Sequence, residues 1–504
     1  MKPLLATQQT AQYKRHRPEN TLLYQLVERY YPDFKEALSQ QGKHLPKFVE
    51  REFDEFLRCG RLEHGFLRVV CDDCKHEKRV AFSCKRRGFC PSCGARRMAE
   101  SAALLVDDVL QGYPIRQWVL SLPIPLRLLL ARYPSELGKV LGIIHRAIST
   151  HIVNRAGFSN KQAKTGAVTL IQRFGSALNL NIHFHMLFLE GAISENALGG
   201  TSFTRIKAPS HNDMVELVHT ISYRIAQYLE KVGLVERDME NSYLNLPIDD
   251  EDSLLQLQGA SVSYRIAIGP QQGKKVFTLQ TLPASTEGEY GQLANISGFS
   301  LHAGVFANAD EPEKLERLCR YISRPAISEK RLSMTQHGKV RYELKTPYRD
   351  GTTHIFFEPI DFIGKLAALL PPPRLNLTRF FGVFAPNSNL RAQVTASQRG
   401  KNSPRLINEG NEQSNKAYHA RGMSWAQRLK RVFNIDINEC EKCQQHNVGV
   451  IACIIDSVVI QKILAHLDKA CPTSEPVMQL PPLRASPDEQ HDAFIVQRDF
   501  NFGA

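Results

Sequence analysis

The stretch Asn179-Leu-Asn-Ile-His-Phe-His-Met-Leu-Phe-Leu-Glu190 places two histidines, His183 and His185, one residue apart within a run of strand-forming residues. Side chains alternate between the two faces of a β-strand, so both imidazoles project from one face and can bind a single cation. The apolar residues between and around them occupy the other face and are expected to enter the core. A lone buried histidine is more often a hydrogen-bonded core residue than a metal ligand, so the neighbouring sequence is needed to distinguish the two roles.

The neighbouring segments predict an antiparallel sheet. Residues 166–174 form a second strand-like run, and a turn at Gly175 joins it to a strand predicted at 180–192, giving a hairpin that carries both histidines. Further strands are predicted at residues 114–123 and 299–306. Helices are predicted from the apolar spacing of residues 20–58, 97–110 and 124–153. The pattern as a whole predicts an α+β fold.

Two imidazoles rarely complete a catalytic metal site, so a neighbouring strand is expected to supply a third ligand. Gln172 is the first candidate, because the hairpin can bring it alongside His183. His302, in the strand predicted at 299–306, is the second candidate. For both residues the alternative is an ordinary hydrogen bond within the sheet. Imidazoles, an amide and open positions suit Mg²⁺ or Mn²⁺ shared with phosphate oxygens better than a closed zinc site.

A helix is predicted from Asp310 to Arg324, since Pro312 stands at its start and Pro325 closes it. Its buried stripe is predicted to consist of Leu315, Leu318, Cys319 and Ile322. Tyr321 falls on another, exposed face, which it shares with the cationic residues Lys314, Arg317 and Arg324. Cations beside a phenol favour its ionised form and hold a phosphate, so Tyr321 is the predicted nucleophile. Downstream, residues 341–351 interleave cations with Tyr342 and Tyr348, as single-strand binding surfaces do.

Four cysteines form two Cys-x-x-Cys pairs, Cys71 with Cys74 and Cys90 with Cys93, fifteen residues apart. This spacing predicts a zinc ribbon, in which each pair contributes two thiolates to one tetrahedral structural ion. The alternative is a set of unliganded buried thiols.

Other cysteines leave further possibilities open. Cys59, His64 and Cys84 lie close to the predicted ribbon and can form part of a second site or replace one of its ligands. A later pair, Cys440 with Cys443, has no matching second pair nearby. A half-ribbon or a decayed ribbon is therefore as compatible with this later pair as a working metal site.

The charge of the chain is strongly basic and unevenly placed. The net charge is +13 over 504 residues. Residues 75–97 hold eight Lys or Arg against one acid, and residues 391–431 hold nine against two. Both stretches predict polyanion-binding surfaces, although a basic run is usually solvated surface. The cations expected to contact a nucleic-acid backbone beside the second cysteine pair are Lys85, Arg86, Arg87, Arg96 and Arg97.

The compartment expected from the sequence is the cytoplasm. The amino-terminal residues lack the apolar core of a signal peptide, and apolar windows such as residues 118–130 are interrupted by Pro and Arg. Eleven cysteines, an odd number, do not fit a secreted disulfide framework in a chain of this length. We therefore expect thiols and metal ligands, and no membrane association.

Four motifs together resemble the rolling-circle insertion-sequence transposases of bacteria, which belong to the His-hydrophobic-His endonuclease superfamily. These motifs lie at Phe89–Met98, Gln172–Asn181, Arg320–Pro325 and Gly382–Asn387. The resemblance covers nearly the whole chain. It implies a small antiparallel sheet whose metal polarises a phosphodiester while Tyr321 attacks it, leaving a 5′-phosphotyrosine and a free 3′-OH. Arg317 stands where some relatives carry a second tyrosine, so the chain resembles the single-tyrosine branch linked to common regions.

The resemblance also implies partners and domains. The partners are single-stranded ends of the mobile element and target DNA. The free 3′-OH would prime DNA synthesis by the host replication machinery. The expected domains are a helical and zinc-ribbon DNA-binding domain at 1–110, a nuclease domain at 111–386 with a polar insertion at about 195–290, a linker at 387–423, and a basic Cys-x-x-Cys region at 424–504.

These residues are also compatible with two other classes of protein. One is a metal-dependent phosphodiesterase that uses water, with Tyr321 only structural. The other is a non-catalytic zinc-ribbon DNA-binding protein whose histidine pair is vestigial. Divalent-metal dependence distinguishes the transposase and the phosphodiesterase from the non-catalytic DNA-binding protein. A covalent protein–DNA adduct distinguishes the transposase from the phosphodiesterase.

Overall fold

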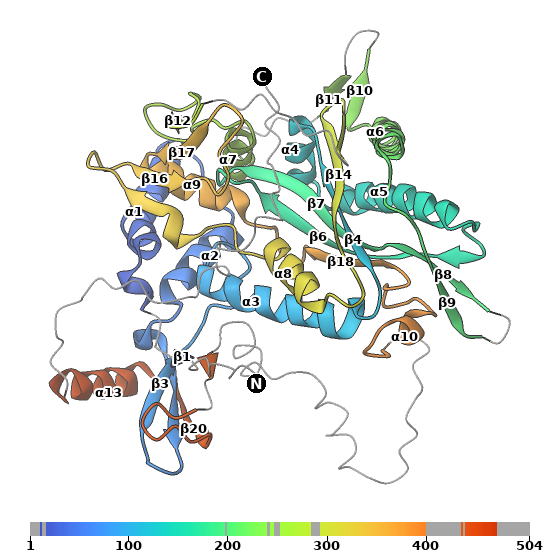
Figure 1. Cartoon of the computed structure of the whole chain (residues 1–504). Helices are drawn as coiled ribbons and strands as arrows, with labels where there is room; N and C mark the ends of the chain where they lie inside the picture. Colours follow the sequence, from blue (N-terminus) through green and yellow to red (C-terminus); the bar gives the residue numbers. More distant parts are fainter. Residues whose placement is uncertain are drawn as a thin grey trace.

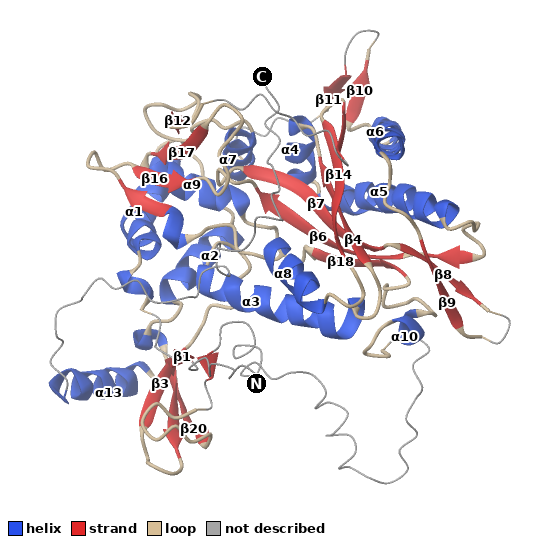
Figure 2. Ribbon diagram, viewed as in Figure 1, coloured by secondary structure: helices blue, strands red, loops and turns tan. Residues whose placement is uncertain are grey.

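The structure, a computed structural model, describes residues 11–12, 17–196, 199–238, 242–245, 252–283, 293–399, 435–436 and 439–470. Within these residues the chain is an α+β protein with antiparallel sheets, as predicted (Figure 1, Figure 2). Its largest sheet has six strands in the order β13-β14-β4-β7-β6-β18, and all neighbours in it are antiparallel. The strands are β4 (Ile115–Ser121), β6 (Gly166–Phe174), β7 (Leu180–Leu189), β13 (Leu293–Ile296), β14 (Phe299–Ala307) and β18 (Thr378–Gly382).

The hairpin predicted around Gly175 is β6 and β7. The strand predicted at 180–192 is shorter, however, because β7 ends at Leu189 and the chain continues as β8 in a different sheet. Glu190 stands at this break, where its buried carboxylate forms ion pairs with Arg116 and Arg205. That separate sheet consists of β5 (Ala163–Lys164), β8 (Gly191–Glu195) and β9 (Thr201–Arg205).

One face of the six-stranded sheet packs on helices α4 (Ile124–Arg132), α5 (Pro134–Arg155) and α6 (His211–Lys231). The residues of β7 that alternate with the histidines lie on this face and are fully buried: Leu180, Ile182, Phe184, Met186 and Phe188. Burying a side chain of this size contributes about 1.5–3 kcal/mol each. The apolar face predicted for this strand is therefore confirmed.

Helix α6 differs from the prediction of a polar insertion at about 195–290. It starts with a reciprocal Ser210–Asp213 capping box and buries a complete apolar stripe against the sheet's core. That stripe consists of Met214, Leu217, Val218, Ile221, Ile225 and Leu229. The segment is polar on average because the opposite face of the helix meets solvent, which composition alone does not distinguish from a loop.

The other face of the sheet, which carries the histidines, is covered by α3 (Pro91–Ala103), its π-helical continuation Leu104–Leu110, and α8 (Pro312–Ile322). Figure 1 shows α3 and α8 on one side of the strands and α5 on the other. A Cβ at Gly94 would lie 2.7 Å from the Pro325 side chain, so only glycine allows α3 this close to the end of α8. The histidines therefore lie between the sheet and these two helices.

A second core surrounds the amino-terminal helices α1 (Leu22–Ser39) and α2 (Lys47–Arg58), together with α7 (Ser253–Val262) and α9 (Pro359–Leu369). A four-stranded sheet packs there, formed by β12 (Phe277–Gln280), β15 (Leu332–Met334), β16 (Val340–Glu343) and β17 (Thr352–Phe357). The short helical turns are η1 (Pro18–Asn20), η2 (Leu62–His64) and η4 (Glu329–Arg331).

A three-stranded sheet joins the two ends of the sequence. It consists of β2 (Phe66–Cys71), β3 (Glu77–Ala81) and β20 (Val448–Ile454), with α13 (Ser457–Ala470) following β20. Small pairs are β1 (Ala11–Gln12) with β19 (Ile435–Asp436), and β10 (Val235–Arg237) with β11 (Ser242–Leu244). Of the linker predicted at 387–423, α10 (Arg391–Val394) is described, and residues 400–423 lie outside the described residues. No helix in the described part of the chain has the length and apolarity to cross a membrane.

Candidate active site and zinc centre

His183 and His185 lie in the middle of the six-stranded sheet, on the same face of β7. Their exposed fractions are 2% and 0%, and their ring centroids are 4.9 Å apart. The shared face predicted from their spacing is confirmed. The strand positions both rings rigidly, because β4 and β6 pair with β7 on either side.

The sheet register places Gln172 beside the histidine pair. One row across four neighbouring strands consists of Ser300, Ser121, His183 and Gln172. Directly opposed residues of antiparallel strands share a face, so Gln172 and His183 are immediate neighbours. His302 lies in the next row, opposite Val119, which is in turn opposite His185. It is therefore two strands from His185, about 10 Å in strand spacing.

These positions favour Gln172 over His302 as a third ligand. Among the described residues, no third His, Cys, Asp or Glu forms a metal-sized group with the histidine pair. The amide nitrogen of Gln172 donates a hydrogen bond to the carbonyl oxygen of Ile322 at 3.1 Å. This bond connects the sheet to the end of α8 and leaves the amide oxygen of Gln172 for a further partner.

Gln117 on β4 lies on the histidine face of the sheet and contacts His185. Its amide nitrogen lies 2.7 Å from Nδ1 of His185, whereas the buried Nε2 has no hydrogen-bond partner within the described part of the chain. Burial, followed by nearby His183 and Arg324, lowers the pKa of His185 well below its usual range, so the ring is neutral. Turning the Gln117 amide over, which exchanges its nitrogen and oxygen, would let the oxygen accept from Nδ1–H and leave Nε2 of His185 a lone pair for a metal. Sequence reasoning missed Gln117, although a polar residue inside an apolar strand was a signal.

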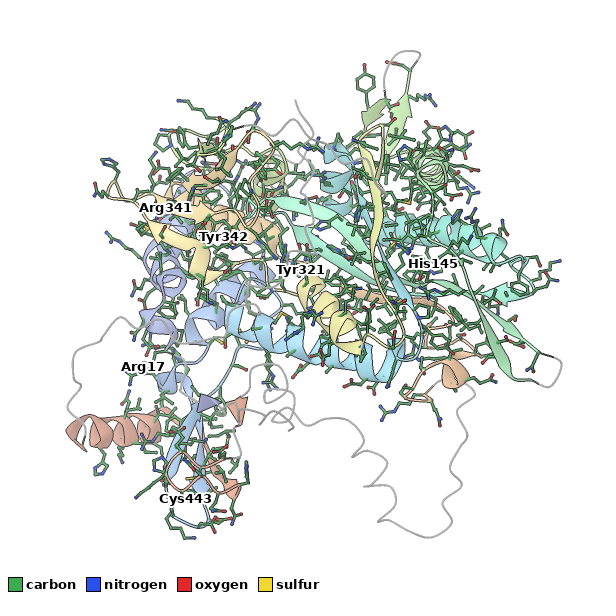
Figure 3. All side chains as sticks on the ribbon, viewed as in Figure 1. Arg17, His145, Tyr321, Arg341, Tyr342 and Cys443 are labelled. Atoms are coloured by element: carbon green, nitrogen blue, oxygen red, sulfur yellow. The ribbon has the colours of Figure 1, made fainter. Side chains whose placement is uncertain are left out.

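Tyr321 is buried, contrary to the prediction of an exposed face. It is 8% exposed and packs with Leu318 and Ile322 in the cluster between α8 and the sheet. The predicted stripe of Leu315, Leu318, Cys319 and Ile322 is buried as expected. Because both α3 and the sheet contact α8, the buried arc of this helix is wider than one stripe and includes Tyr321. Figure 3 shows Tyr321 on α8, beside the strands.

Two cations flank the Tyr321 ring. The guanidinium carbon of Arg324 lies 4.3 Å from the ring centroid, and the ammonium of Lys345 lies 4.6 Å from it. The other predicted cations lie elsewhere: Lys314 pairs with Glu311 at 3.2 Å, and Arg317 is exposed. Of the three cations predicted to flank Tyr321, only Arg324 therefore contacts its ring. The second cation at the ring, Lys345, comes from the stretch 341–351 and was not predicted.

The tyrosines of that stretch are placed differently from the stacking surface predicted there. Tyr342 is fully buried in the amino-terminal core, with the guanidinium of Arg331 4.9 Å from its ring centroid. Tyr348 is partly exposed. A buried ring cannot stack on a base without unfolding its surroundings, so Tyr342 does not serve as a stacking platform.

A cavity of about 310 Å³ lies beside this constellation. Gln172 and Arg324 line it on the side of the sheet and α8, and Arg87 and Arg97 line it on the side of the amino-terminal domain. Arg173 also lines it, and burial lowers the pKa of its guanidinium to about 10. A cavity with this lining is suited to an anionic ligand.

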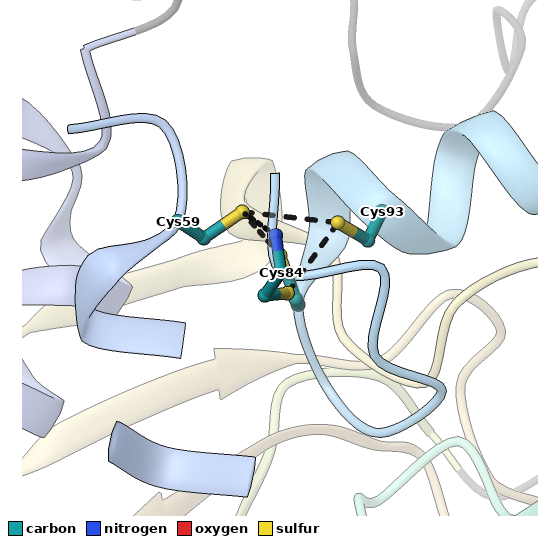
Figure 4. Close-up of side chains that lie close together, drawn as sticks. Cys59, Cys84 and Cys93 are labelled. Atoms are coloured by element: carbon teal, nitrogen blue, oxygen red, sulfur yellow. Dashed lines mark hydrogen bonds between the residues drawn. The ribbon is translucent and has the colours of Figure 1, made fainter. Parts of the chain in front are cut away.

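The zinc centre consists of Cys59, Cys84, Cys90 and Cys93. Figure 4 labels three of these cysteines, Cys59, Cys84 and Cys93. Sulfur–sulfur distances within it are 3.7 Å for Cys59–Cys93, 3.4 Å for Cys84–Cys93 and 3.7 Å for Cys59–Cys90. Tetrahedral zinc with Zn–S bonds of about 2.3 Å requires sulfurs about 3.8 Å apart. The four thiols therefore fit one structural zinc ion.

The predicted ribbon of Cys71, Cys74, Cys90 and Cys93 is wrong in its grouping. Cys71 and Cys74 lie beside Cys440 and Cys443 instead, and they form a second group of four thiols there. The reason is geometric, because the β2–β3 hairpin carries the first Cys-x-x-Cys turn away from α3, which carries the second. His64 belongs to neither group.

The basic residues around the zinc centre are largely engaged within the chain. Arg86 forms a two-pronged ion pair with Glu55, and Arg96 pairs with Glu100 at 3.0 Å. Arg97 donates to the carbonyl oxygens of Lys85 and Arg86 at 3.0 and 3.1 Å, which ties the Cys84 loop to α3. Arg87 is exposed at the cavity, although it also donates to the carbonyl oxygen of Leu375 at 2.7 Å. Lys85 is exposed.

Two segments of the chain match known protein families. Residues 26–122 match a family described as "Transposase zinc-binding domain", and this segment contains the whole Cys59–Cys93 centre. Residues 166–391 match a family described as "Putative transposase", and this segment contains His183, Gln172 and Tyr321. Neither the curated proteins nor the solved structures that were compared gave a match.

The class of protein defined by these features is a transposase, an enzyme that cuts and joins DNA. Within this class, the chain combines a transposase domain with an amino-terminal zinc-binding domain that holds four clustered thiols. DNA is therefore its partner, and a mobile element is its genetic context.

Proposed function

We propose that the protein nicks and rejoins single-stranded DNA at the ends of a mobile element, in rolling-circle transposition, through a 5′-phosphotyrosine on Tyr321. The observation that carries this proposal is the packing of α8 on the histidine face of the sheet. Tyr321 contacts Arg324 there, and Arg324 is close enough to His185 to lower its pKa. Gln172, opposite His183, bonds to the residue that follows Tyr321. These contacts support the proposal that the nucleophile and the metal ligands form one site.

The chemistry follows from these residues. Nε2 of His185, an imidazole nitrogen of His183 and the amide oxygen of Gln172 would hold Mg²⁺ or Mn²⁺, which neutralises charge on the scissile phosphate when bound. The phenol oxygen of Tyr321 attacks phosphorus and loses its proton to solvent, the bond to the 3′-oxygen breaks, and that oxygen takes up a proton from solvent as the free 3′-OH. One ester replaces another, so the reverse reaction rejoins DNA without ATP.

The basic cavity provides a place for the strand. Arg87, Arg97 and Arg324 line it, and it adjoins Gln172. Guanidinium groups bind phosphate oxygens in paired hydrogen bonds, so a backbone phosphate here would be fixed beside the histidines. The zinc centre supports this wall of the cavity, because the loop between Cys84 and Cys90 carries Arg87.

A water-using phosphodiesterase is the second candidate, and the burial of Tyr321 favours it. Tyr321 is 8% exposed, so little of its side chain is accessible to a scissile phosphate, whereas a water molecule is small enough to act as the nucleophile in such a crowded site. The two candidates share the metal site and differ only in what attacks phosphorus.

The test uses the purified wild-type chain and end-labelled single strands that tile the DNA flanking its gene. With Mn²⁺ present, we expect cleavage of strands from the element's ends and a labelled adduct that survives denaturing electrophoresis. Protease treatment should leave a nucleotide on the peptide containing Tyr321. Cleavage without an adduct would establish the phosphodiesterase, and metal-independent binding without cleavage would establish a non-catalytic DNA-binding protein.

Gln172→Ala is expected to raise the Mn²⁺ concentration needed for half-maximal cleavage by about tenfold or more. Gln172→Glu separates ligation from positioning, because it keeps an oxygen for the metal but loses the hydrogen bond to Ile322. If Gln172 is a ligand, the glutamate variant retains metal response and the alanine variant does not. Equal impairment of both variants with an unchanged metal titration would assign Gln172 a positioning role. Gln258→Ala, at a buried glutamine on α7, is the matched control.

A further inference from the structure

Two Cys-x-x-Cys turns from distant parts of the sequence face each other at the end of the β20-β2-β3 sheet. Cys71 and Cys74 stand at the end of β2, and Cys440 and Cys443 precede β20, which pairs with β2. The sulfurs of Cys71 and Cys443 are 3.5 Å apart, and those of Cys74 and Cys440 are 3.4 Å apart. All four sulfurs lie within 4.8 Å of one another. Figure 1 shows β20 in the same small sheet as β3, although their colours mark distant parts of the sequence.

The two turns have the same backbone hydrogen bonds. In each turn the residue four positions after the first cysteine, Lys75 or Gln444, donates its N–H to that cysteine's carbonyl oxygen at 2.9 Å. The first cysteine, Cys71 or Cys440, donates its own N–H to the carbonyl five positions further on, also at 2.9 Å. Lys75 and Gln444 both have a φ of 58°, which residues other than glycine seldom adopt. The two turns therefore present their thiols in the same way.

We propose that these four cysteines bind a second structural zinc ion, which fastens residues 439–470 to the amino-terminal domain. Sulfurs 3.4 to 3.5 Å apart are well beyond the disulfide bond length of about 2.05 Å. They are close to the separation of about 3.8 Å that tetrahedral zinc requires. Cys440 and Cys443 lie outside both segments matched by family models, so neither match assigns this site.

Apart from the pairing of β20 with β2, the carboxyl-terminal segment buries little surface that would hold it in place. Among its residues whose burial the structure describes, 439–466, only Cys440 and Ile460 are buried. Val450, Ile451 and Ile455 are 62%, 56% and 74% exposed. The ion pair of Lys78 with Glu441, at 3.9 Å, lies near the surface and contributes little. Ligation of a metal by preformed turns supplies the stabilisation that burial does not.

The experiment measures zinc content and protease protection of the full chain. Wild type should hold two zinc ions per chain, and Cys440→Ser/Cys443→Ser should hold one. In this variant trypsin should release the segment containing Lys442 and Lys462 at least about tenfold faster, because local opening becomes frequent. Cys453→Ser is the matched control, since Cys453 is an exposed cysteine of β20 outside both groups, and it should keep both ions and the protection.

A variant of the amino-terminal cysteine pair tests the same site independently. Cys71→Ser/Cys74→Ser should lose one zinc ion and show the same faster release. Cys59→Ser/Cys84→Ser should lose the other ion while the carboxyl-terminal segment stays protected. Cobalt substitution gives a second readout, because the thiolate-to-metal absorbance should fall by about half in each variant. One zinc ion in wild type, or two ions in Cys440→Ser/Cys443→Ser, would overturn the proposal whatever the outcome of the DNA assays.

Discussion

Tyr321→Phe is expected to abolish the covalent protein–DNA adduct and to lower strand cleavage by about a thousandfold or more, because it removes the attacking oxygen. The fold should be retained. The Tyr321 ring keeps its packing between α8 and the sheet, and its hydroxyl makes no hydrogen bond with another described residue. The melting temperature should therefore move by no more than a few degrees, a change of about 1 kcal/mol. Denaturing electrophoresis with labelled single strands measures the adduct.

Tyr348→Phe is the matched control for this variant. Tyr348 is partly exposed and lies in the same cation-rich stretch as Lys345, so it is a more accessible phenol close in sequence to the site. Its substitution should leave the adduct unchanged. An adduct that persists in Tyr321→Phe and disappears in Tyr348→Phe would move the nucleophile to Tyr348. Single-strand affinity should stay within about twofold in both variants, since Lys and Arg contacts dominate it.

Much of the sheet could be predicted from the sequence because its signals are local. Strand β4 occupies residues 115–121 of the predicted 114–123, and β6 occupies the predicted residues 166–174. The hairpin turn fixed the register, and this register in turn placed Gln172 opposite His183. Alternation with period two and a short turn leave few other arrangements for such a pair of strands.

The remaining features depend on contacts that spacing cannot reveal. A Cys-x-x-Cys turn shows which two thiols share a site, but Cys74 and Cys440 are 366 positions apart and only the pairing of β2 with β20 joins them. The burial of Tyr321 depends likewise on α3 covering α8, and the core role of α6 depends on its partner sheet. In each case the helix or turn was predictable, whereas its partner in space was not.

The zinc centre of Cys59, Cys84, Cys90 and Cys93 supports the wall of the basic cavity. The Cys59–Cys93 centre fixes the loop that carries Arg87, and Arg97 ties the same loop to α3. Helix α3 packs in turn against the Pro325 end of α8, next to Arg324. Loss of this zinc ion would therefore disturb the basic cavity first and the histidine strand only indirectly, since β7 is held by its two neighbouring strands.

His183→Ala and His185→Ala, singly and together, are expected to lower metal-dependent cleavage by at least about a hundredfold while single-strand binding stays within about twofold. Cleavage requires the imidazole nitrogens, whereas binding rests on cations such as Arg87 and Arg324. Each substitution also empties buried space, and His185→Ala leaves the Gln117 amide without its partner. Each should therefore cost about 2–4 kcal/mol of folding stability, so cleavage has to be compared well below the melting temperature.

His145→Ala distinguishes loss of chemistry from loss of stability. His145 lies on the opposite side of the sheet, stacked 5.3 Å from Phe188 and 4.4 Å from Phe381, and burial lowers the pKa of its ring to about 4. Removing this imidazole should lower the melting temperature to a similar degree, yet cleavage and its Mn²⁺ titration should stay close to wild type. Equal loss of cleavage in His145→Ala and His185→Ala would show that the histidine pair is structural. Loss confined to His183 and His185 would establish them as the metal ligands, because only the face that they share with Gln172 reaches the phosphate and Tyr321.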